Sequence, residues 1–236
     1  CNSSSDSKVW MEKVNLFFKS LKRKGTFFMD STKPKIFTTK FMVRTAIFST
    51  IAAILYVVPG LQFKLPFFLA FLEVHFDEIP AFIASFAYGP LCGIMVLLIK
   101  TIIKLPFTHT ATVGEWLDLL YGIALILPAS LIYKNHRSLK GALIGLLVGL
   151  LTHLLVTFAC SATFVIDMYT FFYSTITSDQ ILALAQQLNP HVSDVHASIA
   201  FYCFLPFNAF KDALVIIITI ILYPRIRYFT EKRYQK

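Results

Sequence analysis

Asn208 and Lys211 have the residue types and the spacing to bind a small polar group. Because they are three positions apart, their side chains share one face if the segment is helical. The Asn208 amide offers a donor and an acceptor, and the Lys211 ammonium offers a cationic donor. Phe207 belongs to the run of apolar side chains around them. We therefore predict a polar pair on an aromatic wall where a ligand could bind.

Three acidic residues are placed to join this site. Glu115 and Asp118 are also three positions apart, at the start of a predicted helix, and Asp167 ends another apolar segment. An alternative role for Glu115 and Asp118 is to stabilise the positive end of the helix dipole. Lys211 could likewise pair with Asp212 or Glu115 and only hold helices together.

The composition indicates which elements must position these residues. Of the 236 residues, 56% are hydrophobic and 15% are charged, against about 45–50% and about 25% in soluble domains. The mean hydropathy is +0.67. A soluble fold of this length could not hide such an apolar surplus. These values exclude soluble, disordered and collagen-like classes and predict an all-α, polytopic membrane protein.

The apolar runs predict six membrane-spanning helices, over approximately 41–59, 79–88, 90–105, 116–133, 141–166 and 203–223. Lys and Arg cluster mainly outside these runs, in 1–44, 134–140 and 225–236. An even number of spans places all three clusters on one side, which the positive-inside rule assigns to the cytoplasm. We therefore expect a multi-pass plasma-membrane protein with both termini cytoplasmic.

The chain is predicted to divide into three parts. Residues 1–40 form a basic extension, in which the amphipathic segment 9–24 suits an interfacial helix. An extension without a partner is the alternative. Residues 41–225 form the six-helix membrane domain, and residues 226–236 form a basic cytoplasmic tail.

The half of the protein opposite the basic clusters is predicted to hold a polar cavity open to the outside. Nine of the 13 acidic residues fall there: Glu73, Asp77, Glu78, Glu115, Asp118, Asp167, Asp179, Asp194 and Asp212. The loop 60–78 is predicted to have a strand-like end, and the long segment 167–200 to carry a surface helix around 178–188. Lys104, near the end of the third span, is predicted to extend its ammonium to the interface.

Small residues predict where helices approach closely. Gly141, Gly145 and Gly149 follow a GxxxGxxxG pattern that favours helix packing. The first span carries a second small face that could dock a partner helix, and its candidate docking residues are Ala46, Ser49, Thr50 and Ala53. His153, alone in the fifth span, is interpreted as a bonded core histidine.

Motifs for catalysis or ATP binding are missing from the sequence. It contains no GxxxxGKS/T, HExxH or GxSxG pattern, and its Cys and His residues lack zinc spacing. The basic clusters carry no aromatic-interleaved RNA motif, so nucleic acid is not an expected partner. We expect a protein that is not an enzyme, holds no metal and takes its energy from a partner or a gradient.

The segment Asp77–Gly93, DEIPAFIASFAYGPLCG, resembles a stretch of the S components of energy-coupling-factor (ECF) transporters. The resemblance extends over about 41–225. It implies a six-helix bundle that binds a vitamin as the transported ligand, without a cofactor. It also implies partners, namely a transmembrane coupling subunit and two ATPase subunits.

Two further features are similar to the riboflavin-specific type of this family, the Gly114-Glu115 pair and the Asn208-x-x-Lys211 spacing. The resemblance implies that these residues contact the ligand. Asp167 is the nearest match to an Asn that the family has near the end of the fifth span. The family's Ala-x-x-x-Ala docking signature is loosened on the first span.

A flavin suits these residues chemically. Its isoalloxazine ring is flat and mostly apolar, so aromatic walls can stack on it. Asn208 can bond along the polar edge of the ring, and Lys211 can favour its electron-rich side. Glu115 and Asp118 can accept hydrogen bonds from ribityl hydroxyls. The alternatives are an S component for another vitamin, such as pantothenate or folate, and a stand-alone secondary transporter driven by protons through Glu115, Asp118 or Asp167.

Overall fold

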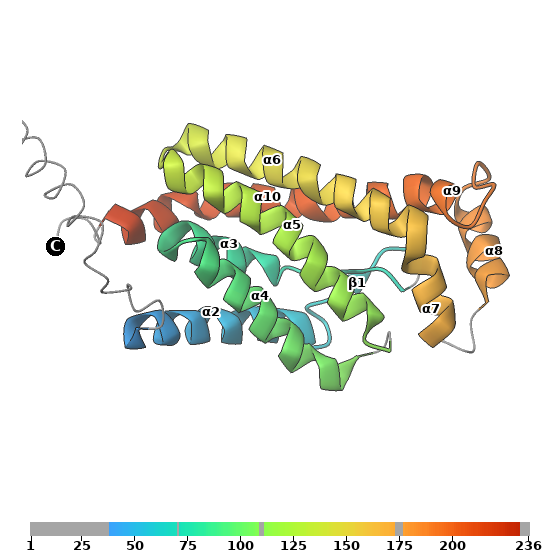
Figure 1. The fold of residues 1–236 in the computed structure, drawn as a ribbon, viewed down its shortest axis with the longest axis horizontal. Coiled ribbons are helices and arrows are strands. Elements are labelled where there is room, and N and C mark those ends of the chain that lie inside the picture. Colours follow the sequence, from blue (N-terminus) through green and yellow to red (C-terminus); the bar gives the residue numbers. More distant parts are fainter. Residues whose placement is uncertain (1–37, 70, 109–110, 173–176, 232–236) are drawn as a thin grey trace, which may run out of the picture. The chain divides into compact units, whose positions relative to one another are not determined.

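The computed structural model describes residues 38–69, 71–108, 111–172 and 177–231. Within these ranges the chain is mainly helical (Figure 1). Most of the predicted extension 1–40, with its segment 9–24, lies outside the described residues, as do the last positions of the basic tail.

The first helices of the membrane domain follow the predicted apolar runs closely. α2 spans Thr39–Val57, α3 Glu78–Tyr88, α4 Pro90–Lys104, α5 Val113–Asn135 and α6 Leu139–Cys160. A 3-10 turn, Leu105–Phe107, follows α4 directly. Their bounds lie within a few residues of the predictions because each run is cut by Gly, Pro or charged residues.

Two of the predicted spans contain a π-helical turn. α6 continues through the π turn Ser161–Val165 into α7 (Ile166–Phe172). α9 (Ala197–Ile199) continues through the π turn Ala200–Phe204 into α10 (Leu205–Glu231), which includes the first part of the predicted tail. Such turns shift the helical register and are frequent at functional sites.

The loop predictions also match the structure. β1 (Phe63–Lys64) and β2 (Glu73–Val74) form a short antiparallel ribbon, and β2 is the strand-like end of the loop before α3. The predicted surface helix is α8 (Ser178–Leu188). It begins where the Thr177 hydroxyl accepts from the Gln180 backbone N–H and the Gln180 side chain accepts from the Thr177 N–H, a capping box.

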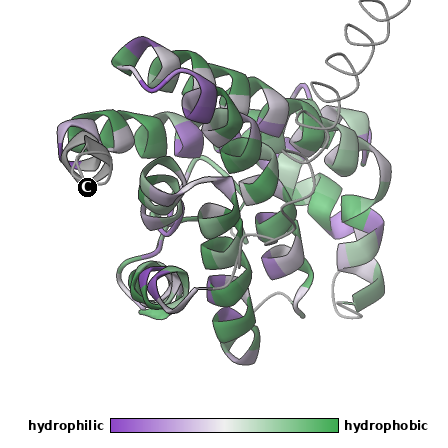
Figure 2. Ribbon diagram, turned by 60° about the vertical axis from the view of Figure 1, so that its left-hand side comes forward, coloured by the Kyte–Doolittle hydropathy of each residue, from purple (hydrophilic) through white to green (hydrophobic). Residues whose placement is uncertain are grey.

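Five helical runs among the described residues are long and apolar enough to cross a membrane: Thr39–Val57, Pro90–Phe107, Val113–Asn135, Leu139–Phe172 and Ala197–Arg225. α3, predicted as the second span, has only 11 residues. That is roughly 16 Å of helix, about half of a typical hydrocarbon core. The predicted six-helix bundle thus consists of five full-length helices and one half-length helix, all predominantly hydrophobic (Figure 2).

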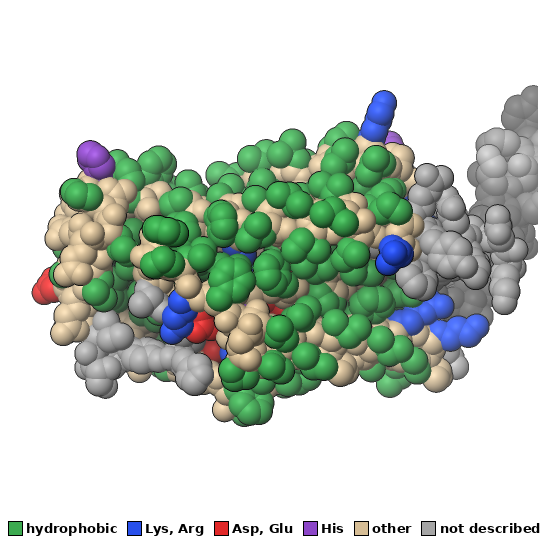
Figure 3. Space-filling model, turned by 180° about the vertical axis from the view of Figure 1, so that it is seen from behind, with side chains coloured by type: hydrophobic (Ala, Val, Ile, Leu, Met, Phe, Trp, Pro, Cys, Tyr) green, Lys and Arg blue, Asp and Glu red, His purple; other side chains and the backbone are tan. Residues whose placement is uncertain are grey.

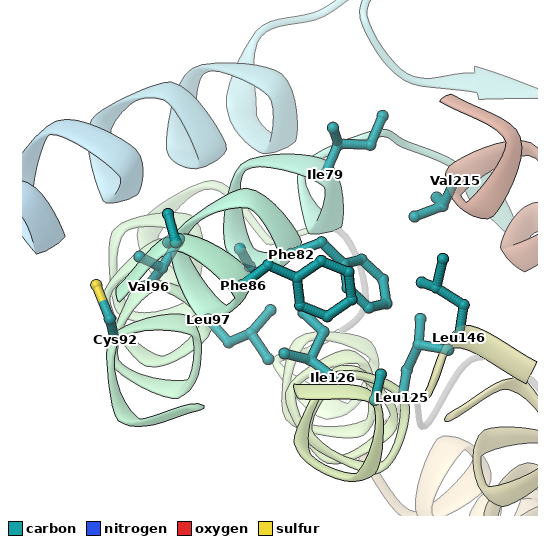
Figure 4. Close-up of a cluster of buried hydrophobic side chains, with 14 of the residues drawn as sticks. Ile79, Phe82, Phe86, Cys92, Val96, Leu97, Leu125, Ile126, Leu146 and Val215 are labelled. Carbon is teal, nitrogen blue, oxygen red and sulfur yellow. The ribbon is translucent and has the colours of Figure 1, made fainter. Parts of the chain in front are cut away.

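The largest apolar core joins α3 to α4, α5, α6 and α10 (Figure 4). Phe82 is fully buried, and its ring lies beside Ile126 and Leu146. Phe86, one turn along α3, stacks on Tyr133 of α5 with 4.5 Å between ring centroids. α3 therefore lies inside the bundle rather than at its lipid-facing surface.

The predicted small-residue packing occurs between α5 and α6. A Cβ atom at Gly145 would lie 2.6 Å from the carbonyl oxygen of Ala129. At Gly149 it would lie 2.3 Å from that of Leu125. Both positions therefore admit only glycine at this helix separation.

The four candidate docking residues of α2 lie on one side of the helix, but only two of them are exposed. Ala46 and Thr50 are exposed, whereas Ser49 and Ala53 are buried against the rest of the chain. Ser49 and Ala53 form the edge of this side that packs against the rest of the chain, and Ala46 and Thr50 form the edge that is left exposed. Only the exposed pair is accessible to a partner.

Hydrophobic side chains cover much of the outer surface (Figure 3). Most of the Lys and Arg side chains visible on this face gather towards one end. This pattern suits a protein whose middle is surrounded by lipid and whose basic end meets headgroups.

Candidate functional site

A pocket with about 660 Å³ of empty space, partly open to solvent, lies among the ends of several helices. Its lining comes from α2, the segment before α3, α4, α5, α7 and the start of α10. The lining residues are Tyr56, Phe71, Leu72, Glu73, His75, Lys104, Gly114, Glu115, Leu117, Asp118, Tyr121, Tyr169, Phe204, Phe207, Asn208 and Lys211.

Aromatic rings form much of the wall. The Phe71 ring centroid lies 5.3 Å from that of Tyr169 and 6.2 Å from that of Phe204. Phe207 meets Phe68 edge to face at 5.3 Å. These contacts attach the loop before α3 to α7 and α10, so rings from distant parts of the sequence share one wall.

The Asn208 side chain is bonded to a backbone carbonyl of the π turn before α10. The Asn208 side chain is 5% exposed and its Nδ2 donates to the carbonyl oxygen of Phe204 at 2.9 Å. This bond holds the amide in place while using only one of its hydrogens, so the amide oxygen can still accept from a ligand. The predicted face shared by Asn208 and Lys211 is present, because both residues line the pocket.

Lys211 is buried among acidic groups of other helices. Its Nζ lies 3.0 Å from Glu78 Oε1 and 3.0 Å from Asp118 Oδ1. The alternative pairing with Asp212 is wrong, because residues adjacent on a helix point about 100° apart. Asp212 instead contacts His153, with 2.6 Å between Oδ2 and Nδ1, and both side chains are fully buried. His153 is thus a bonded core histidine, as the sequence indicates.

A buried ionic network lies below the pocket. Lys100 Nζ donates to Asp77 and, at 2.7 Å, to Asp118 Oδ2. The His75 ring contacts Asp77 through Nδ1 and lies 3.4 Å from Asp118 Oδ1 through Nε2. Asp118 connects this group to Lys211 at 3.0 Å. The network therefore ties the start of α3 to α4, α5 and α10.

His75, Asp77 and Asp118 bring ligand atoms close enough together to suit a metal ion. However, the ammonium of Lys100 donates to both carboxylates. A lysine in that position supplies the compensating positive charge that a metal would otherwise bring. The geometry fits an ion-pair network better than a metal centre.

The predicted acidic residues have different surroundings. Glu73, Glu115 and Asp118 line the pocket, and Glu115 is 3% exposed. Asp167 does not line it: its side chain is 67% exposed and lies 4.0 Å from His196 Nε2. The structure therefore does not bring Asp167 to the other predicted site residues.

Lys104 does not extend to the interface as predicted. Its side chain is 5% exposed and lines the pocket. The Nζ atom lies 5.1 Å from the centroid of the Tyr56 ring and donates to Gln62 Oε1 at 3.4 Å. The Tyr56 ring and the Gln62 amide, both near the end of the first span, hold the lysine inside the protein.

Several residues that line the pocket were not predicted from the sequence, among them Tyr56, Phe71 and Tyr169. Nothing in their local sequence separates them from core aromatic residues. Tyr121 could have been found, because it lies three positions after Asp118 and therefore shares its helix face.

The helices and the pocket together are those of a multi-helix membrane protein that binds a small molecule at the ends of its helices. The family model for the substrate-specific component of ECF transporters matches residues 40–223. The chain therefore belongs to this family, and the predicted family and fold are confirmed. It is a multi-pass membrane protein and a transporter component.

Two curated relatives cover most of the chain. The riboflavin transporter RibU of Staphylococcus aureus (strain TCH60) is 29% identical over 184 residues, which make up 78% of this chain and 90% of that protein. The riboflavin transporter FmnP of Bacillus subtilis (strain 168) is 26% identical over 194 residues, or 80% and 95%. A solved S component of a bacterial ECF transporter matches with a TM-score of 0.59 at 26% identity, covering 80% of this chain and 96% of that one.

Proposed function

We propose that this chain captures riboflavin from outside the cell as the S component of an ECF transporter. A transmembrane coupling subunit and two ATPase subunits, all separate chains, supply the energy. The names of both curated relatives support riboflavin as the ligand. The family supports the division of labour with other subunits.

The observation that carries this proposal is the combination of aromatic walls and a few polar groups in one pocket. Rings such as Phe71, Tyr169 and Phe204 can cover the faces of a flat isoalloxazine system. Asn208 can bond both to donors and to acceptors along its polar edge. Glu115, on the α5 side, can accept from ribityl hydroxyls.

The charges of the lining favour an uncharged ligand. Three carboxylates, Glu73, Glu115 and Asp118, face two lysines, Lys104 and Lys211. A phosphate dianion would add to the negative side of this balance. We therefore expect riboflavin to bind more tightly than its 5′-phosphate.

The side of the membrane follows from the basic residues. The pocket takes Lys104 from the end of α4 and Glu115 from the start of α5. The basic link 134–140 lies at the other end of α5. If that link is cytoplasmic, the pocket lies towards the outside.

A fluorescence-quenching titration of the chain purified in detergent tests the proposal. Saturable, stoichiometric quenching of riboflavin is expected, with weaker competition by riboflavin 5′-phosphate and none by pantothenate or folate. A protein that ignores riboflavin but binds one of the other vitamins would identify an S component of different specificity. Uptake by the chain alone in proteoliposomes, driven by a proton gradient, would instead establish a secondary transporter.

A further inference from the structure

We propose that Lys104 is the residue that brings positive charge to the ligand in this pocket, donating to an electron-rich oxygen of the flavin. Lys211, in contrast, is mainly committed to carboxylates of the protein. This inference rests on the proposed function, because it assumes that the pocket binds riboflavin.

Lys100 and Lys104 provide the first comparison. They are one turn apart on α4, and both ammonium groups lie near the Tyr56 ring, at 4.5 Å and 5.1 Å from its centroid. Lys100 is fully buried and donates to two carboxylates, those of Asp77 and Asp118. Its charge is therefore compensated inside the protein, and it does not line the pocket.

Lys104 is nearly as buried but has different partners. Its Nζ makes one long hydrogen bond, 3.4 Å, to Gln62 Oε1 in addition to the contact with the Tyr56 ring. No Asp or Glu of the described residues forms an ion pair with it, and the internal residues left undescribed, 70, 109–110 and 173–176, contain no acid. A buried ammonium without a carboxylate is costly. Since an ammonium has three donors, a ligand oxygen can supply what the protein does not.

Gln62 holds this lysine in position. Its Nε2 donates to the backbone carbonyl of Tyr56, which turns Oε1 towards Lys104. The amide oxygen is a neutral acceptor, so it orients the ammonium without cancelling its charge. We therefore regard Gln62 as a positioning residue and Lys104 as the ligand-binding residue.

Lys211 lines the same pocket with a compensated charge. Glu78 and Asp118 each lie 3.0 Å from its Nζ. Loss of Lys211 would leave Glu78 without its ion pair in the described structure and leave Asp118 with Lys100 alone, and would disturb the fold. Loss of Lys104 leaves no carboxylate unpaired, so its effect should be confined to the ligand.

The oxygen that Lys104 meets can come from two parts of riboflavin, the carbonyls of the ring edge or the hydroxyls of the ribityl chain. Lumiflavin, which has the ring and a methyl group in place of the chain, separates the two sources. If Lys104 binds a ring oxygen, removing the lysine weakens the binding of lumiflavin as much as the binding of riboflavin. If it binds a hydroxyl, only riboflavin is affected.

The test compares Lys104→Met, Lys104→Arg and the control Lys134→Met, an exposed lysine at the far end of α5. Dissociation constants for riboflavin and lumiflavin are measured by fluorescence quenching, and melting temperatures in parallel. Lys104→Met should bind riboflavin about 10- to 100-fold more weakly, as expected for losing a hydrogen bond to a charged group. Lys104→Arg should recover part of the affinity, and Lys134→Met should bind riboflavin as tightly as the wild type. All three variants should have the melting temperature of the wild type.

Two results separate this inference from the proposed function. Wild-type protein that binds no riboflavin would refute the proposed function, and the inference with it. Wild-type protein that binds riboflavin, with Lys104→Met binding it equally well, would refute the role of Lys104 alone. A Lys104→Arg protein that is stable but binds no better than Lys104→Met would also refute it, because the charge would then not matter.

Discussion

Replacing Lys100 with Met should make the protein unfold at a markedly lower temperature. The buried Lys100 ammonium donates to Asp77 and to Asp118, in the latter case at 2.7 Å. Met is of similar length but carries no charge, so the two carboxylates would face each other in the interior. Asp118 would keep Lys211 at 3.0 Å, whereas the contact left to Asp77 in the described structure is the ring of His75.

The size of the effect follows from this loss of compensation. Removing one partner of a buried ion pair costs about 3–5 kcal/mol, because the remaining charge stays buried. For a domain of this size each kcal/mol lowers the melting temperature by roughly 2–4 °C, which gives a total of roughly 6–20 °C. Scanning fluorimetry of the detergent-purified variant measures this shift. Lys134→Met removes an exposed lysine of the last turn of α5 and should melt with the wild type.

Two further variants make this prediction specific. The double variant Asp77→Asn/Lys100→Met removes one charge of each sign and should recover part of the lost stability. Lys104→Met, which leaves no carboxylate unpaired, should keep the wild-type melting temperature. If Lys100→Met melts at the same temperature as the wild type, the ionic network contributes no net stability and this prediction is refuted.

Three other substitutions test separate parts of the structure. Asn208→Ala should weaken riboflavin binding by about 1–3 kcal/mol in a fluorescence titration, because it removes an anchored donor and acceptor. An unchanged affinity would show that the ligand binds elsewhere. Asp167→Ala should leave the affinity unchanged, since Asp167 lies outside the pocket, and a clear loss would extend the site towards it. Gly149→Val should lower the free energy of unfolding by about 1–3 kcal/mol because its Cβ would meet the Leu125 carbonyl. The exposed Leu147→Val on the same helix is the control, and equal melting of the two would contradict the close contact between α5 and α6.

Much of the fold could be predicted because the relevant signals are local. Apolar runs interrupted by Gly, Pro and charges place α2, α4 and α5 within a few residues, and the Thr177 capping box marks the start of α8. The glycine pattern of α6 predicts close packing, and the structure supplies the missing information, that the partner is α5. Such patterns depend on neighbours in the sequence, so one sequence is enough to read them.

The pairing of charges could not be predicted in the same way. Lys211 forms an ion pair with Glu78, which lies far away in the sequence, whereas its neighbour Asp212 pairs with His153. Lys100 and Lys104 occupy the same helix face with similar flanks, but among the described residues carboxylate partners are found for Lys100 alone. Which lysine is compensated depends on where α3 and α5 place their acids, and local sequence carries no information on that distance.

The short α3 explains why network and pocket occur together. α3 has only 11 residues and packs against α4, α5 and α10. The helix begins inside the bundle, where Glu78 and the preceding Asp77 are fully buried. Buried carboxylates need compensation, and Lys100 and Lys211 provide it. The loop that leads into α3 supplies Phe71, Glu73 and other lining residues. The network also contributes His75, Asp118 and Lys211 to the pocket lining, so the start of α3 brings the ionic network and the pocket to the same part of the bundle.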